Sequence, residues 1–216
     1  PATVQYNFNG IFVPSTATAS YSISNNLIGS TVTTNSINVG AGSTAATNFT
    51  GINSSATGTV SSSGNTIQNC TVSGTGASIL TGITVANATG VLSITNNNII
   101  SCSQAGSGVF TAISNAAAVS TLTISGNIIR SHSISSGTSA FTGILNAGAV
   151  TAAININSNQ LGIAGVGNGL ITFSVANSAN LFGINNTGGI STAALTIQAN
   201  NFQGITNSSG YATRII

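Results

Sequence analysis

Two short motifs alternate along the whole chain, and this repeat restricts the possible folds more than any other feature. The first motif, Leu-x-Ile-x-x-Asn-x-Ile, is clearest at residues 92–99 and 122–129. The second motif, Phe-Thr-Gly-Ile, occurs intact at residues 49–52 and 141–144. A repeat with a period of roughly 20 to 50 residues indicates a solenoid, a propeller or an array of stacked units.

The spacing of the second motif separates constant segments from variable ones. Its third position recurs at residues 10, 51, 82, 112, 143 and 183, in steps of 41, 31, 30, 31 and 40 residues. From each of these positions the next first motif begins after only 9 to 12 residues, so the extra length falls within residues 31–48 and 164–180. Variable length at one place in a constant repeat is typical of a solenoid with loops on one face.

Within the first motif, apolar and polar residues alternate with a period of two. This alternation predicts strands with one buried face, followed by a corner at the asparagine and another short strand. The density of Gly, Ser, Thr and Asn disfavours helix. The third residue before the asparagine is apolar in every copy except Ser62: Ile23, Ile94, Ile124, Ile156 and Ile197.

The composition excludes many functions. Arg130 and Arg214 are the only formal charges among 216 residues, and Asp, Glu and Lys are absent. The chain therefore lacks the carboxylate pair of glycosidases, the acidic ligands of calcium sites and a Ser-His-Asp triad, so we expect no enzyme and no cofactor. Two cations are too few to bind a nucleic-acid backbone. No apolar run approaches the roughly 18 residues of a membrane helix, so no membrane insertion is expected.

The motifs ending in Asn97, Asn127 and Asn159 resemble the right-handed parallel β-helix of the pectate-lyase-like superfamily and of secreted bacterial surface and adhesin-type proteins. The resemblance implies an all-β, single-stranded β-solenoid over residues 1–216, with about six coils of roughly 30–41 residues and open, uncapped ends. The acidic calcium ligands and basic catalytic residues of the lyases have no counterpart here.

The resemblance also implies that inward asparagines stack between coils and hydrogen-bond along the solenoid axis. A buried amide is costly unless both its donors and its acceptor are used, and stacked amides satisfy one another. The predicted ladder contains six residues: Asn26, Asn65, Asn97, Asn127, Asn159 and Asn200.

Cys70 and Cys102 each lie five residues after a motif asparagine, which predicts that they are neighbours in one column. Adjacent strands are about 4.8 Å apart, a separation that a disulfide can span. His132 holds the next place in this column, but a Cys-Cys-His metal site would lack a fourth ligand. Stacked free thiols and a disulfide both remain open, and a metal or catalytic role is the least favoured interpretation.

Two predicted outward columns precede the motif asparagine by four and by two residues, and they hold hydroxyls and amides. A flat, uncharged ladder of this kind could bind ice or a repetitive polysaccharide. The simpler interpretation is that a strand needs a polar outer face.

These observations favour a structural, non-catalytic component of an extracellular fibre or cell-surface adhesin. Low net charge favours association, and uncharged strands lack protection against edge pairing. The alternatives are the flat-faced binding module and, less favoured, a degenerate carbohydrate-active β-helix. The expected setting is extracellular or at the cell surface, with surface glycans as a possible further partner.

The ends of the repeat give the last prediction. Neither end shows the polar capping repeat that finishes most solenoids. We therefore expect a segment of a longer solenoid or the subunit of an end-to-end filament, whose partner is itself or further coils of the same chain; the alternative is a monomer with termini folded over its ends. The predicted assembly residues are Phe8, Gly10, Ile11, Leu195, Ile197, Phe202, Ile215 and Ile216.

Overall fold

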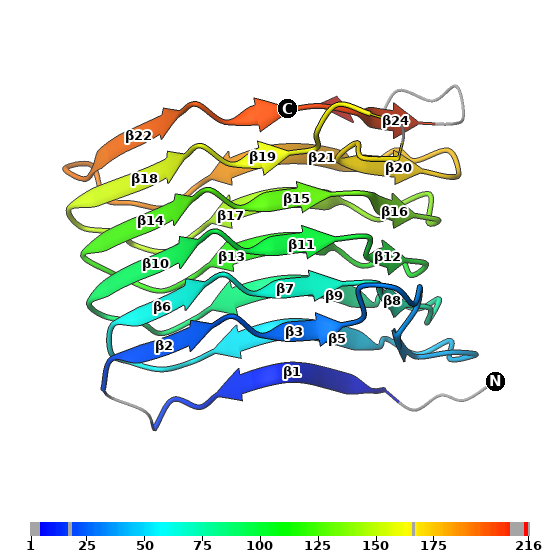
Figure 1. The fold of residues 1–216 in the computed structure, drawn as a ribbon, viewed down its shortest axis with the longest axis horizontal. Helices are drawn as coiled ribbons and strands as arrows, with labels where there is room; N and C mark the ends of the chain where they lie inside the picture. Colours follow the sequence, from blue (N-terminus) through cyan, green and yellow to red (C-terminus); the bar gives the residue numbers. More distant parts are fainter. Residues whose placement is uncertain (1–4, 17–18, 166, 208–213, 216) are drawn as a thin grey trace.

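The structure, a computed structural model, describes residues 5–16, 19–165, 167–207 and the backbone of 214–215. The chain forms a right-handed parallel β-helix of about six coils, which confirms the predicted fold class (Figure 1). The described residues contain strands, turns and loops but no helix. Successive coils lie directly above one another, and each contributes one strand to each of four parallel sheets.

Sheet I contains the Phe-Thr-Gly-Ile motifs. Its strands, in spatial order, are β1 (Asn7–Val13), β5 (Asn48–Ser54), β9 (Ile79–Val85), β13 (Phe110–Asn115), β17 (Phe141–Asn146), β21 (Asn180–Asn186) and β25 (Arg214–Ile215). Sheet II contains the strands that precede the ladder asparagines. These are β2 (Tyr21–Ser24), β6 (Val60–Ser63), β10 (Val91–Thr95), β14 (Thr121–Ser125), β18 (Ala153–Asn157) and β22 (Ala194–Gln198).

Sheets III and IV are narrower, because their strands have only two or three residues. Sheet III contains β3 (Leu27–Gly29), β7 (Thr66–Gln68), β11 (Asn98–Ile100), β15 (Ile128–Arg130), β19 (Gln160–Leu161) and β23 (Asn201–Phe202). Sheet IV contains β4 (Ile37–Val39), β8 (Cys70–Val72), β12 (Ser103–Gln104), β16 (His132–Ile134), β20 (Ile171–Phe173) and β24 (Ile205–Asn207).

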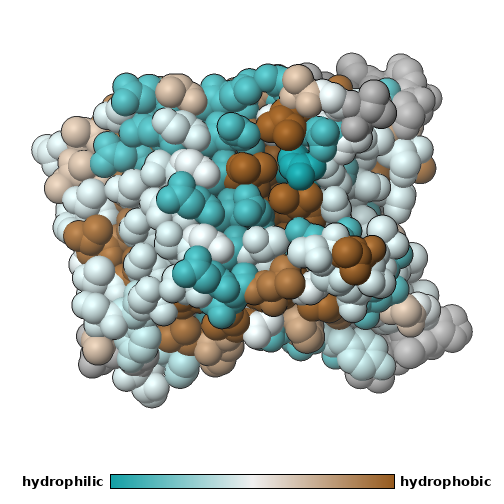
Figure 2. Space-filling model, viewed as in Figure 1, coloured by the Kyte–Doolittle hydropathy of each residue, from teal (hydrophilic) through white to brown (hydrophobic). Residues whose placement is uncertain are grey.

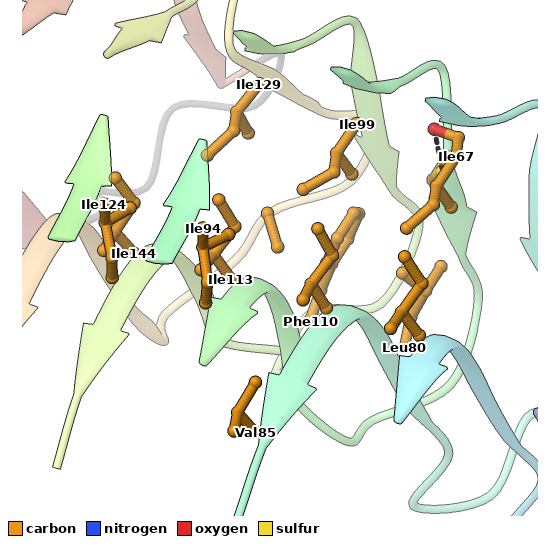
Figure 3. Packing of buried hydrophobic residues seen from close by; sticks show 14 of the residues in the cluster. Ile67, Leu80, Val85, Ile94, Ile99, Phe110, Ile113, Ile124, Ile129 and Ile144 are labelled. Carbon is orange, nitrogen blue, oxygen red and sulfur yellow. Dashed lines mark hydrogen bonds between the residues drawn. The ribbon is translucent and has the colours of Figure 1, made fainter. Parts of the chain in front are cut away.

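The strands pair in register, so equivalent motif residues become columns parallel to the axis. Leu92 pairs with Leu122 and Ile94 with Ile124 in sheet II. These inward columns fill the space between the sheets with stacked aliphatic and aromatic side chains (Figure 3). The two-residue period of the sequence is therefore the inward and outward alternation of each strand.

The glycine of the second motif interrupts this alternation. Gly51 is left out of the pairing of β5, between the paired residues Thr50 and Ile52, and both Gly51 and Ile52 are buried. A Cβ atom on Gly51 would lie 2.6 Å from Cδ1 of Ile67 and 2.7 Å from the carbonyl oxygen of Gly82. The facing sheet III side chain and the next strand leave room here only for a very small residue, which is glycine in most coils and Ala112 in β13.

The corner between sheets II and III depends on a left-handed backbone conformation. The residue before each ladder asparagine has a φ between 54° and 66°, and four of these six residues are not glycine: Asn25, Asn96, Ser158 and Ala199. Left-handed φ is unfavourable for side chains with a Cβ atom, although asparagine tolerates it better than most. The bend it produces turns the following asparagine into the core.

Most of the extra length of the first and fifth coils lies at one corner, between sheets III and IV. Residues 30–36 connect β3 to β4, and residues 162–170 connect β19 to β20. In the coils between them the same corner has one or two residues, such as Asn69 between β7 and β8. The sequence places the extra length within residues 31–48 and 164–180. The rest of these two ranges contains strands β4 and β20.

Candidate functional site

The asparagine ladder is the most regular polar feature of the core. The backbone N–H and the side-chain Nδ2 of Asn97 both donate to Oδ1 of Asn127, at 2.9 and 3.0 Å. The same pair of bonds joins every neighbouring pair from Asn26 to Asn200, which confirms the predicted ladder.

Each interior ladder amide uses all of its hydrogen-bonding groups. In addition to its bond to the following coil, Nδ2 of Asn97 donates to the carbonyl oxygen of Ser62 in the preceding coil, at 3.0 Å. Oδ1 of Asn97 accepts both bonds from Asn65. Four ladder residues are completely buried, so these bonds offset the cost of removing the amides from water: Asn65, Asn97, Asn127 and Asn159.

The ladder has a direction, because every bond runs from a donor in one coil to an acceptor in the following coil. At the N-terminal side, no residue in the described part of the chain donates to Oδ1 of Asn26. At the C-terminal side, Nδ2 of Asn200 donates back to Ile156 at 2.7 Å. No described residue accepts a bond from the backbone N–H of Asn200. One end thus presents an acceptor and the other presents donors.

The last coil exposes side chains whose counterparts elsewhere form the core. Leu195, Ile197 and Phe202 are 52%, 45% and 47% exposed, whereas the equivalent residues of the interior coils are at most 2% exposed. Ile197 and Phe202 border a hollow of about 350 Å³, which Leu181 and Ile184 of β21 also line. The predicted residues Leu195, Ile197 and Phe202 therefore lie together on the described surface of this end.

The predicted residues of the first strand lie at the opposite end. Phe8 is 37% exposed and stacks on Phe49 of the next strand, with ring centroids 5.5 Å apart. Gly10 is exposed and Ile11 is half-buried against the core. Of the remaining predicted assembly residues, Ile215 is described only by its backbone in β25, and Ile216 lies outside the described residues.

The cysteines lie in adjacent coils of one inward column that continues to His132, as their spacing predicts. Both are buried free thiols in this structure. The backbone N–H of Cys102 donates to Nδ1 of His132 at 3.3 Å, and Nε2 of His132 is buried with no partner among the described atoms. Among the described residues, no three His, Cys, Asp or Glu side chains gather closely enough to hold a metal ion.

The two thiols affect each other's ionisation. The hydrogen bond with Cys102, together with burial, raises the pKa of Cys70. The same hydrogen bond lowers the pKa of Cys102, with a smaller contribution from His132 in the same direction and an opposing one from burial.

A second amide ladder was not predicted from the sequence. Nδ2 of Asn115 donates to Oδ1 of Asn146 at 2.8 Å, and Nδ2 of Asn146 donates to Oδ1 of Asn186 at 2.7 Å. All three asparagines follow the first position of the second motif by five residues, a spacing visible in the sequence. Ser54 and Val85 hold this place in other coils, so the second ladder spans only three strands.

The two predicted outward columns lie on the outer face of sheet II, where their side chains alternate with buried ones. Thr95 donates to Ser63 across adjacent strands at 3.3 Å. The face in Figure 2 is a mosaic of hydrophilic side chains and separate apolar patches. The in-register pairing of sheet II places the side chains of each outward column one above another along the axis.

The fold and the ladder together define the class of protein, a parallel β-solenoid with a polar amide ladder inside its core. Comparisons with protein-family models, with curated proteins and with solved structures give no match. No helix in the described residues is long and apolar enough to cross a membrane.

Proposed function

We propose that this chain is a structural, non-catalytic component of an extracellular fibre or cell-surface adhesin. In this role its exposed end coil is covered by further coils, either of the same chain or of a second copy. The observation that carries the proposal is the exposure of Leu195, Ile197 and Phe202, which continue fully buried columns.

The hydrophobic effect supports covering this end. Burying a large aliphatic or aromatic side chain contributes about 1.5–3 kcal/mol. Ile197 and Phe202 form an exposed apolar surface around the hollow, Leu195 is a further exposed apolar side chain of the same strand as Ile197, and exposed apolar surfaces mark interaction sites. A further coil would bury them in the way that each interior coil buries its neighbour.

The charge composition supports association over free diffusion. With a net charge of +2, two copies repel each other weakly. An extracellular or surface location follows from the resemblance to secreted surface proteins, and surface glycans remain candidate partners of such a protein. The absence of Asp, Glu and Lys from the sequence makes a degenerate carbohydrate-active enzyme the less favoured alternative.

Electron microscopy of the purified chain tests the proposal. We expect filaments or end-to-end oligomers, and we expect deletion of residues 1–12 to abolish them while the inner coils stay folded. A matched pair of charge substitutions refines the test. Ile197→Lys at the exposed end should block assembly, whereas Thr95→Lys on the outer face of an interior coil should not. Monodisperse particles of the intact chain at high concentration would contradict the proposal.

A second candidate function is binding of ice or of a repetitive polysaccharide through the outer face of sheet II. The in-register hydroxyl columns favour it, since they repeat at the strand spacing of about 4.8 Å. An ice-recrystallisation assay and a pull-down on insoluble polysaccharide test it. No effect in either assay would remove this candidate.

A further inference from the structure

We infer that the partner at the C-terminal end is a second copy of this chain, bound head to tail so that Asn200 of one copy donates to Asn26 of the next. The inference rests on the proposed function and adds the identity, direction and register of the partner.

The direction follows from the polarity of the ladder. Inside the molecule, the backbone N–H and Nδ2 of each asparagine donate to Oδ1 in the following coil. Asn200 presents both donors beyond the last coil, and Asn26 presents Oδ1 before the first coil. A head-to-tail junction therefore repeats an interior step of the ladder. Nδ2 of the incoming Asn26 also gains the carbonyl oxygen of Ile197, in the role that Ile23 has for Asn65.

Junctions between two N-terminal ends or between two C-terminal ends lack this match of donors and acceptors. Two N-terminal ends would bring Oδ1 of Asn26 against another Oδ1, and two C-terminal ends would bring donors against donors. Each would leave buried amide groups without partners, which is costly. They would also pair the strands antiparallel, whereas every pairing within the molecule is parallel.

The apolar columns continue across the same junction. The first coil places Ile23 and Ile28 at the positions of Ile197 and Phe202 in the last coil, according to the registers of sheets II and III. Ile23 and Ile28 are each 7% exposed in the single chain, so the incoming copy would place an already packed first coil over Ile197, Phe202 and the hollow of about 350 Å³ beside them. The junction therefore buries the exposed end of the core with side chains of the same kind.

Sheet I contains a strand that must be displaced when a second copy binds at this end. β25 pairs with only two residues of β21, Asn180 and Leu181. In a head-to-tail junction the free edge of β1 of the incoming copy takes the same place beside β21, while its other edge stays paired with β5 of its own chain. We therefore expect β1 to displace β25, and deletion of residues 208–216 to increase association.

A cysteine pair measures this register directly. Gln198 and Ser24 lie on the outer face of sheet II and would face each other across the junction, about 4.8 Å apart. Equimolar Ser24→Cys and Gln198→Cys chains are mixed, oxidised mildly and digested with chymotrypsin, since the chain has few sites for trypsin. We expect peptides cross-linked between positions 24 and 198, in higher yield when residues 208–216 are deleted. Each variant alone is the control and should give no such product.

The other outcomes are informative in different ways. Cross-links of 24 to 24 or of 198 to 198 would overturn the head-to-tail register while assembly itself stands. Oligomers without any cross-link between these positions would also overturn the register. A chain that stays monomeric would overturn both this inference and the proposed function. An unchanged yield after deletion of 208–216 would overturn the displacement of β25.

Discussion

At the scale of single residues, the interior of this solenoid depends on amides that satisfy one another. Asn97 and Asn127 lie in a core without counter-charges, yet their donors and acceptors all have partners. The ladder also fixes register, because a coil displaced by one residue would place a buried amide against an aliphatic column. Stability and specificity thus depend on the same side chains.

Removing an interior ladder residue should be costly. Asn127→Ala removes the Oδ1 atom that accepts from the backbone N–H and Nδ2 of Asn97, and the Nδ2 atom that donates to Ile94 and Asn159. The buried backbone N–H of Asn97 then has no partner, and Nδ2 of Asn97 and Oδ1 of Asn159 each keep only one bond. We expect a loss of about 3 kcal/mol in the free energy of unfolding, measured by urea denaturation. Asn26→Ala at the end of the ladder is the control and should cost about 1 kcal/mol. Equal losses at both sites would contradict a cooperative ladder.

The corner residues offer a stabilising substitution. Ser158 has a φ of 56°, which glycine adopts without a steric penalty, so Ser158→Gly should raise the free energy of unfolding by about 1 kcal/mol. Gly126→Ala is the reverse change at an equivalent corner, where a Cβ atom would lie 2.4 Å from Oδ1 of Asn96. It should lower the midpoint of thermal unfolding. A stabilised alanine variant would show that the left-handed corner is not required.

The cysteines should be unreactive in the folded chain. Cys70 and Cys102 have no exposed surface, so a thiol reagent in mildly alkaline solution should label neither until denaturant is added. After unfolding, two thiols should react. A disulfide would instead show no reactive thiol after unfolding without reductant, and a mass lower by two hydrogen atoms. Fast labelling of the native chain would contradict the burial of this column.

At the scale of elements, short strands acquire their stability from the coils on either side. Most strands have three to five residues, too few to be stable alone, and the parallel pairing above and below supplies the missing contacts. The unpaired glycine in sheet I lets the facing strands approach more closely than side chains would allow.

Adding a methyl group at Gly51 tests whether this position must stay small for its backbone to approach Ile67 and the next strand. Gly51→Ala would place a Cβ atom against Ile67 and the backbone of Gly82, so we expect a loss of about 1–3 kcal/mol from overpacking. Ala112 already holds the equivalent place in β13, so Ala112→Gly is the matched control with a loss of about 1 kcal/mol or less. Circular dichroism during thermal unfolding distinguishes the two. A neutral Gly51→Ala variant would contradict the steric role.

The sequence predicts the strands and the first ladder because both repeat at fixed distances from an asparagine. It does not predict the buried Gly51, since an unpaired residue breaks the two-residue period by which strands are found. The sequence also does not predict the second ladder, because its position is occupied by Val85 in one coil and by Ser54 in another. The left-handed φ of Ser158 and Ala199 cannot be predicted from residue type, because neither is glycine, the residue that most readily adopts it.

At the scale of the whole molecule, each coil contacts its neighbours, and the apolar columns end in exposed side chains at the last coil. This arrangement makes the chain polar along its axis, with donors at one end of the main ladder and an acceptor at the other. The low charge leaves little to oppose contact between these ends. A structural role through end-to-end stacking is the function that these properties favour.

Sedimentation of the intact chain over a wide range of concentrations tests the central claim most directly. The account predicts a mass that rises with concentration through multiples of 21.1 kDa, and a return to that single mass for the Ile197→Lys variant. A single species of 21.1 kDa at every concentration, with Leu195 and Phe202 protected from solvent by the rest of the chain, would contradict it.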